Sequence, residues 1–176
     1  MKRTVNLQLF AAEAVQGKKI MYMFRVLGES AQKDATALAF VTENERSNSK
    51  DSETTVTKDG SIRTPGASEI EITATALLAK GDTMAERLEE AMDNDEIVEC
   101  WEINLEEPGT GANKFKAKYY QGYLSEFTLT SSAEEHAEYS LTYAANGKGA
   151  KGEATVSEEQ QEIANYVFAD TQKTGA

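Results

Sequence analysis

The sequence has 176 residues, a length that suits one domain able to bury about 70% of the surface of its unfolded chain. Its 30 acidic and 18 basic residues give a formal net charge of −12, so the surface of the protein is not expected to bind nucleic acid. The one cysteine excludes an internal disulfide, and no run approaches the ~20 apolar residues of a membrane-spanning helix. We therefore expect a single domain over 1–176 with no membrane association.

The first part of the chain predicts an arm followed by a buried strand. Residues 1–17 begin with basic residues but lack the continuous apolar stretch of a signal peptide, and they are interpreted as an N-terminal arm. Residues 20–27 are apolar on both faces, which is typical of a buried strand. Leu38, Phe40 and Thr42 are interpreted as the opening of a second strand.

Residues 44–66 are almost entirely polar. The turn signal Lys58-Asp59-Gly60 lies between two β-prone runs and predicts a hairpin that projects from the body. Pro65-Gly66 is interpreted as a second turn that closes this projecting loop. Long polar insertions are either disordered or functional, and the specific turn chemistry here favours a loop that makes contacts.

The middle of the chain predicts a strand and then a helix. Residues 69–78 alternate between apolar and polar side chains, which predicts a strand with one buried face. A helix is expected over 83–93, capped by Asp82 or Thr83, because Thr83 and Glu86 match a capping box. Its apolar stripe consists of Met84, Leu88, Ala91 and Met92.

Two strands are expected next, over 96–105 and 114–130. The second has seventeen residues, on the order of 55 Å at ~3.3 Å per residue, and Gly122 is expected to mark a bulge or bend in it. Ordinary strands have about five or six residues. A strand of this length indicates a sheet that continues beyond one chain.

The hydrophobic pattern also predicts the registers. In the first hairpin the numbers of opposed residues sum to about 220, which pairs Trp101 with Tyr119, Ile103 with Ala117 and Glu102 with Lys118. A second hairpin turning at 131–135 sets Leu129 near Ala137, Phe127 near Tyr139 and Tyr123 near Tyr143. The body is then a β-meander with one packed helix.

The last segment, 149–176, is expected to be a C-terminal extension. A flexible link follows the glycine-rich run 146–149. Ser157 and Gln160 then predict the capping box of a short helix that carries Ile163, Tyr166 and Val167.

Catalytic and metal-binding patterns are absent from the sequence. Cys100 and His136 are the single members of their kinds, and Cys100 lies in an apolar strand where an inert buried thiol is the default. One histidine and one cysteine cannot complete a zinc site, and the run 93–96 lacks the glycine and distal glutamate of a calcium loop. No phosphate-binding glycine motif occurs. The sequence therefore predicts neither an enzyme nor a cofactor.

Several segments together resemble a known family. The runs KDSETTVTKDGSIRTPG, ALLAKGDTM, CWEINLEEPG, FKAKYYQGYLSEF and NGKG, in this order, resemble the major tail proteins of long-tailed, non-contractile phages of Gram-positive bacteria, of the lactococcal type. The resemblance covers roughly 15–170 and leaves 1–14 outside. It implies a β-sandwich or half-barrel with a flanking helix, six copies in a ring, and stacked rings that form the tube through which genomic DNA passes.

The resemblance also implies a virion location after synthesis in the host cytoplasm, with tape-measure, tail-terminator and tail-tip proteins as partners and no specific binding of DNA. By this resemblance, the projecting loop over 44–66 is expected to make a contact between rings. The candidate self-assembly residues are Lys50, Asp51, Lys58, Asp59 and Arg63 in that loop, and Lys114, Lys116 and Lys118 on the long strand. A monomeric β-sandwich binding module, such as an adhesin or tail-tip domain, and a secretion-tube subunit are the alternatives.

Overall fold

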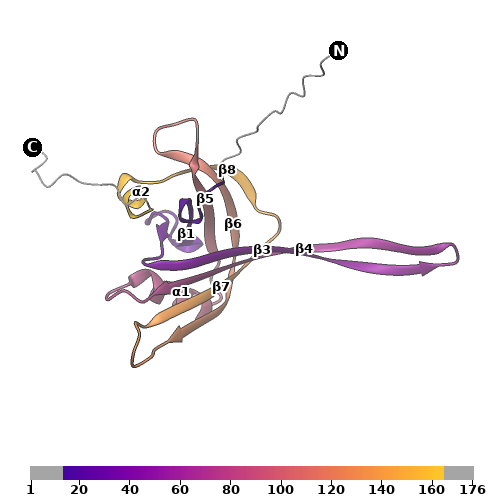
Figure 1. The fold of residues 1–176 in the computed structure, drawn as a ribbon, viewed down its shortest axis with the longest axis horizontal. Helices are drawn as coiled ribbons and strands as arrows, with labels where there is room; N and C mark the ends of the chain where they lie inside the picture. Colours follow the sequence, from indigo (N-terminus) through magenta and orange to yellow (C-terminus); the bar gives the residue numbers. More distant parts are fainter. Residues whose placement is uncertain (1–13, 165–176) are drawn as a thin grey trace, which may run out of the picture.

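The computed structural model describes residues 14–164 and joins all its strands in one antiparallel sheet. Along the sheet the order is β2-β1-β5-β6-β7-β4-β3, and β8 pairs with β6 outside this path. The strands are β1 (Ile20–Val26), β2 (Thr36–Ala37), β3 (Val41–Thr57), β4 (Gly60–Leu77), β5 (Val98–Pro108), β6 (Lys114–Thr130), β7 (Glu138–Ala145) and β8 (Ala150–Thr155). Figure 1 shows the curved body of the sheet and the hairpin of β3 and β4 extending far beyond it.

Two α-helices accompany the sheet within the described residues, α1 (Thr83–Asp93) and α2 (Glu158–Ala164), together with the 3₁₀ turns η1 (Gly17–Lys19) and η2 (Leu27–Glu29). The predicted mainly β fold with one packed helix is confirmed. The Asp82 carboxylate caps α1 by accepting the backbone N–H groups of Met84 and Ala85 at 3.0 and 3.1 Å. No helix in 14–164 has the length and apolarity to cross a membrane.

The long strand β6 holds the body together because three strands pair with it. β5 occupies one edge, while β7 and then β8 occupy the other edge in turn. Gly122 pairs with both β5 and β7, and a Cβ atom there would lie 2.0 Å from the carbonyl oxygen of Ala144. Glycine is therefore required by close approach of the β7 backbone. The bulge expected at Gly122 lies instead at Ser125, between Leu124 and Glu126.

The register of the first hairpin is confirmed and that of the second is wrong. β5 and β6 pair Trp101 with Tyr119, Ile103 with Ala117 and Glu102 with Lys118, as expected. β6 and β7 pair Leu129 with Tyr139, Phe127 with Leu141 and Tyr123 with Ala144, a shift of one to two residues. The longer turn, which runs to Ala137, shifts the partners by two residues, and the extra residue Ser125 on β6 reduces this shift to one beyond the bulge. Phe127 and Tyr139 nevertheless stack, with ring centroids 5.6 Å apart.

The strand order corrects the expected meander. β5, β6 and β7 do follow one another as a meander, but β4 pairs with the far edge of β7 and β1 with the far edge of β5. The chain therefore crosses the body between β4 and β5 through α1. Such pairings between distant segments cannot be read from local alternation, because many registers bury the same face.

The sheet has an apolar cluster on each face. The larger one packs α1, through Ala85, Leu88 and Ala91, against residues that include Tyr120, Tyr139 and Tyr143. The smaller one lies on the opposite face of β5 and β6 around Ile103 and Val156. The expected aromatic pair is confirmed, since the Trp101 and Tyr119 rings are 5.1 Å apart. Both side chains are half-buried, so the more deeply buried face is the other one.

Three further expectations about element boundaries need correction. Phe40 adopts a left-handed φ of 49° and precedes β3, so the expected second strand begins at Val41 instead of Leu38. Pro65 and Gly66 lie inside β4, where Gly66 and Ala67 form a bulge opposite Asp51, and they form no turn. A flexible link was expected after residue 149, but β8 occupies that segment.

The C-terminal capping box is confirmed within the described residues. The Ser157 N–H donates to Oε1 of Gln160 at 3.0 Å, and the Gln160 N–H donates to Oγ of Ser157 at 3.3 Å. Tyr166 and Val167, which were expected on this helix, lie outside the described residues, as do residues 1–13 of the expected N-terminal arm.

Candidate self-assembly surface

The hairpin arm, defined as residues 47–67 of β3 and β4, is the largest exposed feature of the molecule. Every residue in it is exposed, including the apolar Val56 and Ile62, which are 81% and 60% exposed. The predicted turn is confirmed, because Thr57 pairs with Gly60 across Lys58 and Asp59. The Thr57 hydroxyl also donates to the carbonyl of Gly60 at 2.7 Å.

The structure separates the predicted assembly residues into two groups. Five of them lie on the hairpin arm: Lys50, Asp51, Lys58, Asp59 and Arg63. The other three lie on β6 in the body: Lys114, Lys116 and Lys118. Figure 1 shows the arm tip far from β6, so the two residues of the tip, Lys58 and Asp59, cannot join the lysine row in one patch within a single chain.

The lysine row on β6 is largely neutralised by its own chain. The ammonium of Lys116 contacts the Glu107 carboxylate at 2.7 Å, and that of Lys118 contacts Glu102 at 3.3 Å. The hydrogen bond from Lys116 lowers the pKa of Glu107 and raises the pKa of the lysine. Solvent screens the exposed Lys116–Glu107 pair, so both of its partners can exchange it for another contact.

The root of the hairpin arm is fastened to the body through Glu102. This carboxylate accepts hydrogen bonds from the guanidinium of Arg46 on β3, from the Tyr22 hydroxyl at 3.1 Å and from Lys118. Burial, and after it the charge of Glu102, raises the pKa of Tyr22 above its ordinary value. Tyr22 therefore stays protonated and acts as a donor, and the network fixes the direction in which the arm leaves the sheet.

Sequence reasoning missed Tyr22 and Arg46. The sequence held one indication for Arg46. It lies two residues from both Asn44 and Asn48, so in a strand the three polar side chains face the same side of β3. The partner on β5 could not be found, since β3 and β5 are not neighbours in the sheet.

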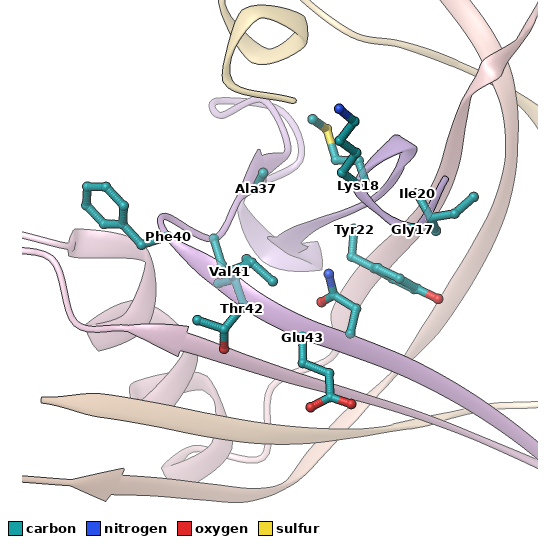
Figure 2. A pocket seen from close by; sticks show the side chains of 12 residues that line it. Gly17, Lys18, Ile20, Tyr22, Ala37, Phe40, Val41, Thr42 and Glu43 are labelled. Carbon is teal, nitrogen blue, oxygen red and sulfur yellow. The ribbon is translucent and has the colours of Figure 1, made fainter. Parts of the chain in front are cut away.

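A cleft lies between the beginning of β3 and the strands β1 and β2. It encloses about 830 Å³ and its lining is mainly apolar, with Ile20, Tyr22, Leu38 and Val41 among the lining residues. Figure 2 shows Tyr22 on one wall, and Val41, Thr42 and Glu43 on the other. The cleft contains no cluster of titratable groups, and no group of three His, Cys, Asp or Glu suited to a metal occurs anywhere in 14–164.

The two candidate reactive side chains do not come together. Cys100 is fully buried in the larger cluster, and burial raises the pKa of its thiol well above the ordinary value. His136 lies in the exposed turn between β6 and β7. A protonated, buried thiol is not a nucleophile, which agrees with the sequence-based rejection of a catalytic pair.

Comparisons with known proteins identify the fold and the family. The family model described as phage tail tube protein matches residues 14–151. A protein of Staphylococcus phage phiMR25, described as a tail protein, is 37% identical over 159 residues, covering 88% of this chain and 81% of its own length. The tail tube of SPP1 superposes with a TM-score of 0.71 at 18% identity, covering 93% of this chain and 95% of that one.

A tail from a gene transfer agent particle, refined with C6 symmetry, has the same fold. Its TM-score is 0.57 at 16% identity, and the match covers 78% of this chain and 98% of that one. The sheet with one packed helix and a projecting hairpin is therefore the tail tube fold. The family model matches most of the chain, so the protein belongs to the phage tail tube protein family.

Proposed function

We propose that this chain is the structural subunit of a phage tail tube, in which six copies form a ring and the rings stack. The tube is part of the virion and encloses the path of the DNA. The whole chain, 1–176, acts as one tail-tube domain and carries out no catalysis, and it is made in the host cytoplasm before assembly. Tape-measure, tail-terminator and tail-tip proteins meet the tube inside and at its ends.

The observation that carries this proposal is the hairpin arm. A two-stranded ribbon in water has little stability of its own, yet the arm runs over 47–57 on β3 and 60–67 on β4, on the order of 25–35 Å, with every side chain exposed. Two exposed apolar side chains near its tip, Val56 and Ile62, lack a partner in 14–164. We infer that a neighbouring ring covers the arm through these residues and through Lys50, Asp51, Lys58, Asp59 and Arg63.

DNA passes through such a tube without specific contacts. Binding to duplex DNA grows with the number of phosphate charges that a protein neutralises, and a chain with a net charge of −12 has few cations to offer. The soluble subunit should show no measurable affinity for duplex DNA at physiological salt.

The decisive experiment removes the arm and leaves the body. Lys50 and Ser68 are directly opposed partners, so residues 51–67 can be replaced by an Asn-Gly turn that joins the two strands. We expect a folded variant that melts like the wild type but forms no tubes by negative-stain imaging and light scattering. Val56→Ala is the milder companion and should reduce tube yield. Normal tubes from the shortened chain would show that the arm is not an assembly element.

The lysine row on β6 is the second part of the proposed surface. Lys114→Glu combined with Lys116→Glu changes exposed residues, so the free subunit should melt close to the wild type. In the assembly, the reversal places like charges across a contact and should lower tube yield. If this double variant forms tubes in wild-type yield, the lysine row makes no contact in the assembly and is only a solvated face of the subunit.

A further inference from the structure

A second pocket, of about 320 Å³, lies at the root of the hairpin arm, and it is strongly basic. β3, β4, β6, β8 and the connection between β7 and β8 all contribute to its lining. Four of the lining side chains are cationic and none is acidic: Arg46, Lys118, Lys148 and Lys151. We call these four residues the basic socket. Such a concentration of positive charge is unexpected in a chain with a net charge of −12.

The charges of the basic socket are not balanced within the described chain. Lys118 and Lys151 are direct cross-strand partners on β6 and β8, an arrangement that is destabilising for like charges. Glu102 pairs with Arg46 and with Lys118, whereas Lys148 and Lys151 form no ion pair with any side chain in 14–161, the range over which side chains are described. Two lysines in a concave pocket thus remain available for an anion from outside.

The backbone holds the socket in shape. Gly147 and Gly149 have φ of +73° and +69°, and they shape the short connection that carries the chain from β7 to β8 along the same edge of β6. A Cβ atom on Gly149 would lie 2.4 Å from the ring of Tyr120, so this connection rests directly on that ring. The Asn146 N–H also donates to the carbonyl of Gln121 at 2.7 Å. Lys148 is therefore fixed beside Lys118 and Lys151 by contacts that need no ion pair.

A complementary stripe of carboxylates lies elsewhere on the same chain. Glu86, Glu89 and Asp93 are exposed on α1 at a spacing of three and four residues, which aligns them over two helical turns, about 10 Å. None of the three forms an ion pair within 14–164. Figure 1 shows α1 on the opposite side of the body from the base of the arm and the connection into β8. One chain cannot bring these two surfaces together.

We propose that the basic socket docks the α1 stripe of a second copy of this chain. This inference rests on the proposed self-assembly and names the contact that orients neighbouring copies. Two different surfaces meet in a head-to-tail contact, and such a contact closes into a ring when the rotation between copies permits it. The incoming carboxylates would be ion-pair partners for Lys148 and Lys151. Their negative charge would also offset the repulsion between Lys118 and Lys151.

The test uses two charge-reversed chains that complement each other. One carries Lys148→Glu and Lys151→Glu, and the other carries Glu86→Lys, Glu89→Lys and Asp93→Lys. Each should fold, as judged by thermal melting, and each alone should assemble at least ~10-fold less than wild type by sedimentation and negative stain. Mixed in equal amounts they should assemble again, because in an alternating ring of even number every socket then meets a stripe of opposite charge.

The matched control is Lys18→Glu with Lys80→Glu, which changes the net charge equally at two exposed lysines outside the socket. It should assemble like the wild type. Lys148→Gln with Lys151→Gln gives a second variant with no new negative charge, and it should also lose assembly. These variants distinguish the socket itself from the total charge of the subunit.

Three results would overturn the proposal. Normal assembly of either reversed chain alone would show that the contact is not used. If the mixture does not assemble although both chains are folded, the α1 stripe is not the partner of the basic socket. Salt-sensitive binding of duplex DNA that Lys148→Glu and Lys151→Glu abolish, with assembly unchanged, would assign the socket to nucleic acid. If wild-type protein itself never assembles, the proposed function fails before this contact is tested.

Discussion

Strands β3 and β4 run through both the body and the hairpin arm, and the two regions are stabilised in different ways. In the body, β4 is paired on both edges and places Ile72, Ala74 and Ala76 in a core where each is at most 1% exposed. In the arm, the same strand is paired on one edge and all its side chains are exposed. Backbone pairing alone thus defines a shape, while burial of apolar surface supplies most of the free energy of folding.

Amide exchange should show this difference most strongly. Amides of β4 over 70–76 lie between β3 and β7 and should exchange only on global unfolding, whereas amides over 61–67 need only local opening of the arm. We expect exchange in the arm to be at least about a hundredfold faster in the free subunit, a gap of roughly 3 kcal/mol. Assembly into tubes should slow the arm amides and leave the body amides unchanged. Equal protection in both regions of the free subunit would contradict the comparison.

Truncating one apolar side chain in each region gives the next largest effect. Leu88 of α1 is fully buried, so Leu88→Ala should lower the free energy of unfolding by about 2–5 kcal/mol. Val56 is 81% exposed, and Val56→Ala should change the free energy of unfolding by less than about 0.5 kcal/mol. Urea unfolding followed by circular dichroism measures both. Similar losses for the two variants would mean that the arm contributes to a core.

Removing one hydroxyl in each region should have a smaller effect. Tyr143 is fully buried and donates to the carbonyl of Val98 at 3.0 Å, so Tyr143→Phe leaves that buried oxygen without this donor and should cost about 1–3 kcal/mol. Thr57→Val removes the exposed bond to Gly60 at the arm tip and should cost less than about 0.5 kcal/mol. Thermal melting of the two variants measures both losses of stability. A larger loss for Thr57→Val than for Tyr143→Phe would contradict the prediction.

Acidification should weaken the body slightly. The hydrogen bonds from Arg87 and Lys33 lower the pKa of Glu29, so the folded protein keeps this group ionised. Its contribution is complete above the unfolded-state pKa of about 4.3 and is lost as the pH falls through the lower folded-state value. Glu29→Gln should therefore melt lower than wild type at pH 7 and decline less on acidification.

Local patterns predicted the elements well and the pairing of distant elements poorly. The helix over 83–93 and the turn at Lys58-Asp59 follow from caps and turn chemistry that act within a few residues. The β5–β6 register could be predicted because a short hairpin leaves few alternatives. The bulge at Ser125 could not, since no residue type requires it, and its effect on the next hairpin was therefore missed.

The basic socket could not be predicted for the same reason. Arg46, Lys118 and Lys151 are dispersed along the chain, and only the pairing of β8 with β6 brings two of them face to face. Residues 150–155 give a weak strand signal, with one lysine, a glycine and a glutamate among six positions. Tertiary pairing stabilises this strand against its own low propensity.

The two-residue turn at the tip of the arm gives evolution an unusually simple way to alter its length. Inserting two residues in each strand lengthens the ribbon by about 7 Å and returns every side chain beyond the insertion to its former face. Inserting one residue in each strand lengthens it by half as much and turns the tip over, so that the opposite set of side chains faces a given neighbour. Reach can therefore be adjusted in discrete steps without touching the core, and the number of residues inserted decides whether the partner still recognises the tip.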